Sequence, residues 1–143
     1  MIQRIQTIWL LLASACLFAS LKVSFYAGNM FPAEELSTSV KTFTQLNGMY
    51  NIITNVLTVS IGVLSFVAIF LYTNRKIQIR TILIAMFLEL LLMFEYETCI
   101  KKFAEGNYTI GSFLQLLVMI FFLMALRGIR KDQKIVAESD RLR

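Results

Sequence analysis

Four long apolar segments, separated by short polar stretches, most constrain what this chain can fold into. They cover residues 5–26, 50–73, 81–100 and 110–126. Each is close to the ~20 residues with which an α-helix crosses ~30 Å of hydrocarbon. Because little sequence is left outside them, we expect a single all-α domain over residues 1–143, an integral membrane bundle of four transmembrane helices. Residues 27–49 would form an outer loop, and residues 127–143 a helical tail.

The basic residues predict the orientation of this bundle. Ten of them would lie on one side: Arg4, Arg75, Lys76, Arg80, Arg127, Arg130, Lys131, Lys134, Arg141 and Arg143. The other side would hold four: Lys22, Lys41, Lys101 and Lys102. Because cytoplasmic loops are enriched in Lys and Arg, both termini and the tail 127–143 are expected in the cytoplasm. The net charge is +5, but the basic residues flank the apolar segments and form no separate patch. Nucleic-acid binding is therefore not expected.

The composition argues against an enzyme. The chain has no histidine, which removes His-based haem and zinc sites and Ser–His–Asp chemistry. The two cysteines, Cys16 and Cys99, form no CxxC motif. No nucleotide motif or group of metal ligands is present either. We therefore expect no catalytic residues, no cofactor and no metal.

Glu89 is the most unusual residue within the apolar segments, because it lies near the centre of the third one. An ionised carboxylate at that depth costs on the order of 2.5–3.5 kcal/mol on insertion scales. No Lys or Arg is available at this depth, so either the carboxyl stays protonated or neutral groups such as Thr58, Ser60 or a tyrosine contact it. A second subunit could also supply a partner. Glu89 is therefore a candidate protonatable site within the membrane.

A second group of polar residues shares a similar depth in the outer third of the membrane. Four antiparallel helices could bring these residues together as one buried polar cluster in which Lys22 and Glu95 form an ion pair. The depth match follows from the topology, whereas the rotation of each helix is not fixed by the sequence. The cluster and Glu89 have three open interpretations: a structural role, contacts with a partner protein, or proton or ion handling. The candidate cluster residues are Lys22, Asn51, Asn55, Glu95 and Gln115.

Several segments on the expected cytoplasmic side resemble a known family. These are residues 1–7 (MIQRIQT), 74–80 (NRKIQIR), 125–132 (ALRGIRKD) and 139–143 (SDRLR). They are similar to a domain-of-unknown-function family of small four-span membrane proteins from Bacteroidota. The resemblance covers the full length and implies a bacterial inner-membrane location. It implies no activity and no catalytic residues, and neither the outer loop nor Glu89 belongs to it.

Two functions are consistent with these observations. The first is a non-enzymatic accessory or scaffold protein that works through helix packing and a basic cytoplasmic face, on which anionic lipid headgroups or a membrane or cytoplasmic protein partner would dock. The second is a small proton-coupled transporter or channel component that uses Glu89. The candidate residues of the basic face are Arg4, Arg75, Lys76, Arg80, Arg127, Arg130 and Lys131.

Overall fold

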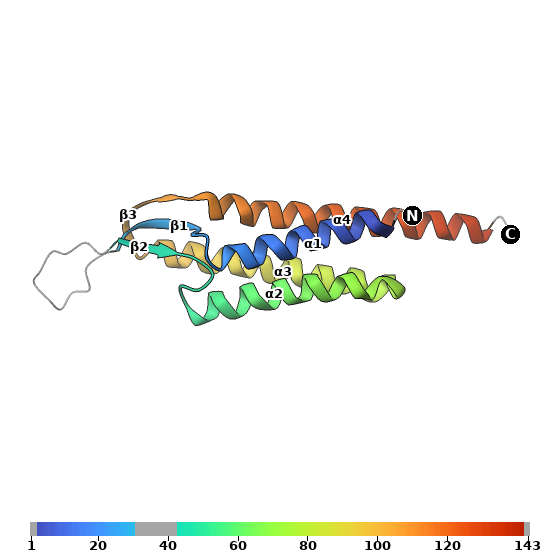
Figure 1. Cartoon of the computed structure of the whole chain (residues 1–143), viewed down its shortest axis with the longest axis horizontal. Coiled ribbons are helices and arrows are strands. Elements are labelled where there is room, and N and C mark those ends of the chain that lie inside the picture. The colour runs from blue at the N-terminus through green and yellow to red at the C-terminus, as the bar shows by residue number, and fades with distance from the viewer. Residues whose placement is uncertain (1–2, 31–42, 142–143) are drawn as a thin grey trace, which may run out of the picture.

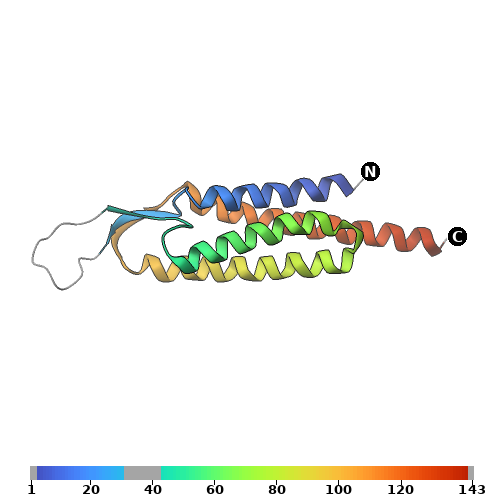
Figure 2. The same cartoon turned by 60° about the horizontal axis from the view of Figure 1, so that its bottom comes forward.

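Four antiparallel helices, arranged side by side along one axis, make up most of the computed structural model (Figures 1 and 2). The structure describes residues 3–30 and 43–141, with side chains for residues 6–30 and 43–135. The two ends of the chain lie at one end of the bundle, beside the connection between the second and third helices. The helices are α1 (Gln3–Ser20), α2 (Ile52–Phe70), α3 (Arg75–Ile100) and α4 (Ile110–Arg141), and a 3-10 turn, η1 (Leu71–Thr73), follows α2.

Three of these helices are long and apolar enough to cross a membrane. The segments Ile52–Thr73, Arg75–Ile100 and Ile110–Ile135 have mean hydropathies of 2.2, 2.0 and 2.1. The described apolar part of α1, Gln6–Ser20, is shorter. The protein is therefore a multi-pass membrane protein, with three helices that satisfy the length of a span by themselves.

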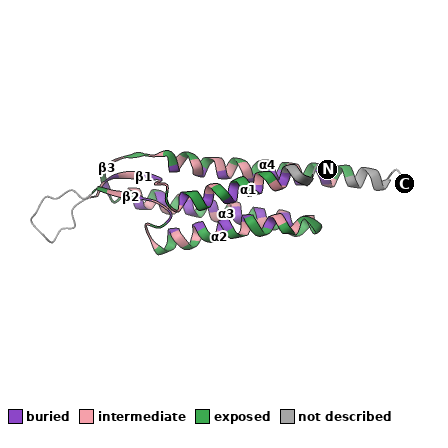
Figure 3. Cartoon of the chain, viewed as in Figure 1, coloured by how far each residue is buried: buried purple, intermediate pink, exposed green. Residues whose placement is uncertain are grey.

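The outer surface of the bundle is apolar, as expected for a protein whose solvent is lipid. Large side chains such as Phe66, Phe87, Phe94 and Ile120 are exposed. Exposed residues occur along the length of the helices (Figure 3). The interior face of α2 instead carries small and hydroxyl-bearing residues, which allow neighbouring helices to approach closely. Among them, the Ser65 hydroxyl donates a hydrogen bond to the carbonyl oxygen of Leu10 at 2.9 Å and joins α2 to α1.

A small antiparallel sheet lies at the end of the bundle opposite the chain termini (Figure 1). Its strands are β1 (Tyr26–Met30), β2 (Phe43–Leu46) and β3 (Phe103–Tyr108), in the order β2-β1-β3. The expectation of an all-α fold was wrong in this respect. The strands are short, and β1 pairs with a segment more than seventy residues away. Pairing between such distant segments leaves little periodic signal in the sequence.

Two of the predicted boundaries also differ in the structure. The first apolar segment was expected to form a span over residues 5–26, but α1 ends at Ser20, and Tyr26 belongs to β1. At the other end of the bundle, residues 75–80 are not a loop but the first turns of α3. The Gln78 side chain is buried there and donates to the carbonyl oxygen of Ala68 at 2.9 Å, which closes the connection between α2 and α3. The residues of the expected tail continue α4 without a break as far as Arg141.

The beginning of α4 is anchored on the chain that links α1 to β1. The Gly111 amide donates to the carbonyl oxygen of Ser24, and the Thr109 amide donates to that of Phe25, both at 3.0 Å. Gly111 is buried, and a Cβ atom at this position would overlap the Ser24 carbonyl. The Phe25 ring in turn stacks on Tyr96 of α3, with ring centroids 4.5 Å apart. These contacts fix the sheet relative to the helices.

Candidate functional site

Glu89 lies on the interior face of α3 and is completely buried (0% exposed). The other buried residues of this face are mostly apolar, and its nearest members along the helix are Ala85 and Leu92. In the part of the chain that the structure describes, neither carboxylate oxygen of Glu89 has a hydrogen-bond partner. A buried polar group without a partner is unusual, because its desolvation is not compensated.

The neutral groups expected near Glu89 bind elsewhere. The Thr58 hydroxyl donates to the carbonyl oxygen of Thr54 at 2.7 Å, within its own helix. Tyr96 lies two helical turns from Glu89 on the same face, within electrostatic reach of the carboxylate, and its hydroxyl is hydrogen-bonded with Thr58. The hydroxyl groups of α2 and α3 thus satisfy one another. The Glu89 carboxylate takes no part in these hydrogen bonds.

Only Gln115 of the predicted polar cluster is buried; the other members are half-buried or exposed. Its side-chain nitrogen has no hydrogen-bond partner among the described residues. Asn51 is the N-cap of α2, where its side chain accepts from the Ile52 amide at 2.7 Å. Asn55 is half-buried on the next turn of that helix.

Lys22 and Glu95 do not share a buried site. Lys22 is exposed in the turn that follows α1. The half-buried Glu95 carboxylate accepts the Thr98 hydroxyl at 3.5 Å and the Cys99 thiol at 3.9 Å, both from its own helix. Among the described residues, Lys22 and Glu95 make no ion pair. The ion pair that was predicted from their similar depth is therefore not formed in the structure.

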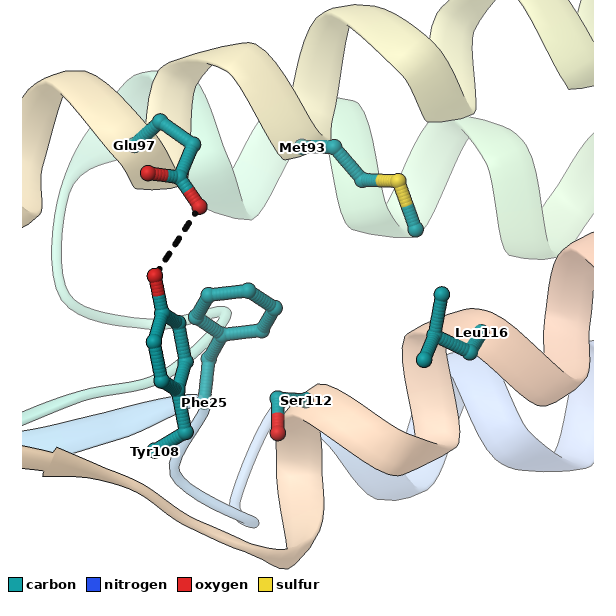
Figure 4. Close-up of a pocket in the computed structure, with 6 residues that line it drawn as sticks. All are labelled: Phe25, Met93, Glu97, Tyr108, Ser112 and Leu116. Carbon is teal, nitrogen blue, oxygen red and sulfur yellow. Dashed lines mark hydrogen bonds between the residues drawn. The ribbon is translucent and has the colours of Figure 1, made fainter.

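A cavity of about 330 Å³ lies between α3 and α4 near the sheet (Figure 4). Met93 and Leu116 face each other across it, and Phe25 and Ser112 complete the wall. At the end near the sheet, the Tyr108 hydroxyl donates to Glu97 Oε1 at 3.3 Å. Desolvation, and secondarily the charge of Glu97, raise the pKa of Tyr108 above its usual value. The wall is apolar and offers no metal ligands beyond this one carboxylate.

The opposite end of the bundle is built around Asp132, which is buried although it lies among cations in the sequence. The Gln6 side-chain amide donates to Asp132 Oδ2 and joins α1 to α4. Arg75 of α3 donates to the backbone carbonyl oxygen of Asp132 at 3.1 Å. Three helices therefore meet at this residue. Neither Gln6 nor Asp132 was predicted from the sequence, because a single polar residue near the border of an apolar segment is typically exposed.

Most of the predicted basic face is exposed around this junction. Arg75 is half-buried and is held by α4, so part of its role is structural. The side chain of Arg4 lies outside the described residues. The exposed members are Lys76 and Arg80 on α3 and Arg127, Arg130 and Lys131 on α4. Of the seven candidates, these five make up the basic face from here on.

Comparison with known proteins gives one match. The family described as a domain of unknown function (DUF4293) matches residues 2–142 of the chain. No curated protein and no solved structure matches it. The match covers almost the whole sequence, from the start of α1 to the end of α4. The chain therefore belongs to the DUF4293 family.

Proposed function

We propose that the protein is a four-span protein of the bacterial inner membrane, with both termini in the cytoplasm. α1 has 18 residues, which at 1.5 Å per residue is about 27 Å and close to the thickness of the hydrocarbon core. It packs along both α4 and α2, and it exposes Ile8, Leu11 and Phe18 on its outer side. A helix at this position beside two spans has lipid as its natural solvent. The charge distribution supports the cytoplasmic location of the termini.

Within this topology, the protein acts as a non-enzymatic accessory or scaffold subunit. The observation that carries this proposal is the basic face, five exposed cations on α3 and α4, two helices that meet at the buried Asp132. Such a junction fixes the two helices that carry the cations relative to each other, so that a partner would meet the same arrangement of positive charge each time. α4 extends past the other helices at this end (Figure 1), which offers a docking element beyond the membrane. A membrane or cytoplasmic protein with an acidic surface would fit this face.

Site-specific photo-crosslinking in the native host tests the docking proposal. A photoreactive phenylalanine analogue would replace Arg80 or Arg130 on the basic face, and Asn107 or Phe43 at the sheet end as matched exposed controls. We expect discrete adducts of higher mass from positions 80 and 130 only. Adducts of equal yield from both ends, or none from the basic face, would contradict a docking role for it.

A second candidate function, proton handling, is favoured by one specific observation. Glu89 is fully buried in the bundle, and its carboxylate has no partner among the described residues. A carboxyl group in such a place can hold a proton and release it only if water reaches it. This candidate requires a movement of the helices that admits water to the interior face of α3.

A further inference from the structure

A pocket of about 370 Å³ lies between α1 and α4, at the end of the bundle that holds the basic face. Along α4 its lining changes from apolar to cationic. Met124 and the α1 residue Trp9 form the apolar part, and Arg127 and Lys131 form the cationic part. From Met124 to Lys131 the helix rises by about 10 Å. The polarity of the wall therefore changes over the distance that separates acyl chains from headgroups in a lipid leaflet.

The pocket is a feature of the packing of α1 against α4. Gly128 lies where the helices approach each other, and a Cβ atom at this position would come within 2.8 Å of Gln6 Cγ. Gln6 in turn holds the Asp132 side chain, the only carboxylate among the described residues that line the pocket. Deeper in the bundle, Trp9 packs on Phe121, with ring centroids 5.8 Å apart. The floor is therefore fixed, while the side chains of Arg127 and Lys131 remain exposed at its mouth.

We infer that this pocket binds one anionic phospholipid, with the phosphate at Arg127 and Lys131 and an acyl chain against Trp9 and Met124. Charge complementarity selects the headgroup, because the two cations outnumber the single carboxylate, which Gln6 already engages. The apolar part selects a lipid rather than a free phosphate compound. Basic pockets between transmembrane helices commonly take anionic headgroups on the cytoplasmic side. The inference rests on the proposal that α1 lies in the membrane, and not on the docking of a protein partner.

Trp9 is the only tryptophan of the chain, so its fluorescence reports on this pocket alone. The purified full-length protein would be reconstituted into phosphatidylcholine vesicles that contain brominated phosphatidylglycerol or, separately, brominated phosphatidylcholine at the same mole fraction. Bromine quenches the indole only at short range. Each Lys or Arg near a membrane surface strengthens anionic lipid binding about fivefold. The pocket has two such cations, so we expect an apparent affinity about 25-fold higher for phosphatidylglycerol than for phosphatidylcholine.

Two double variants that lose the same charge distinguish binding in the pocket from a general attraction of anionic lipid to the positively charged surface. Arg127→Gln/Lys131→Gln should abolish the preference, whereas Lys76→Gln/Arg80→Gln, whose changes lie outside the pocket, should retain it. Quenching by brominated phosphatidylcholine shows that Trp9 of each variant lies in the bilayer. Equal quenching by both lipids, or equal loss of preference in the two variants, would overturn the lipid site but leave the four-span proposal standing. Absence of quenching by either lipid would overturn both.

Discussion

A valine at position 111 is expected to destabilise the protein by about 3 kcal/mol. Gly111 is buried in the first turn of α4, and its amide donates to the Ser24 carbonyl oxygen at 3.0 Å. A side chain at this position would overlap that carbonyl, which is backbone and cannot rotate away. Forcing extra atoms into a well-packed site typically costs 1–3 kcal/mol, and a β-branched residue against backbone belongs at the upper end, about 3 kcal/mol. The measurement is the midpoint of heat-induced loss of the gel-filtration peak in mild detergent.

Gly62→Ala is the matched control for this substitution. Gly62 is also a buried glycine of a transmembrane helix, but a Cβ atom there would lie 3.2 Å from the ring of Phe18. Phe18 is partly exposed on α1 and can turn away at small cost. We expect the Gly62→Ala midpoint to remain close to that of the unmodified protein. A Gly111→Val protein as stable as Gly62→Ala would show that α4 is not anchored on the chain between α1 and β1.

Replacement of Glu89 by leucine is expected to stabilise the bundle by about 1–3 kcal/mol. Both oxygens of its carboxylate are buried without a partner among the described residues, and such a group carries an uncompensated desolvation penalty of that size. Leucine fills a similar volume among Ala85 and Leu92 and removes the penalty. The same thermal measurement checks this result. Gln115→Leu is a comparison variant for the same measurement. The Gln115 side-chain nitrogen is also buried without a hydrogen-bond partner among the described residues.

Glu89→Gln distinguishes the two proposed functions. Glutamine keeps the shape of the side chain but cannot exchange a proton. A scaffold should retain its abundance and its crosslinks in this variant, whereas it should lose the crosslinks when the charges of the basic face are removed. A transporter that uses Glu89 should lose a transport phenotype while its abundance stays unchanged. Loss of that phenotype in Glu89→Gln would contradict the scaffold function and support proton handling.

The sequence predicted the helices that contain an apolar stretch long enough to cross a membrane, because hydropathy records burial in lipid independently of tertiary contacts. α2, α3 and α4 follow this rule. The sheet depends on long-range pairing such as Gly28 with Gly106, and hydropathy contains no trace of it. The ends of the helices were predicted less well for the same reason: Tyr26 is apolar enough for a span, but it pairs with Leu46 of β2 and Tyr108 of β3.

The candidate sites show the same division. A carboxyl group in an apolar segment is expected to face the interior of the bundle, because its exposure to lipid is energetically costly. Glu89 does face the interior. Contacts between helices depend on how each helix is rotated, which depth does not determine. Depth alone suggested Lys22 with Glu95, and the structure instead pairs Gln6 with Asp132. Asp132 lies among cations in the sequence, a setting that is typical of an exposed residue rather than a buried one.

Labelling of single cysteines in spheroplasts tests the topology on which the basic face, its docking role and the lipid pocket all depend. In a Cys16→Ser/Cys99→Ser background, one cysteine would replace Gln3, Arg80 or Asn107, and a membrane-impermeant maleimide would be added before or after permeabilisation. We predict that position 107 reacts in intact spheroplasts, whereas positions 3 and 80 react only after permeabilisation. Reaction of position 80 in intact spheroplasts would contradict a cytoplasmic basic face, and reaction of position 3 would contradict α1 as a fourth span.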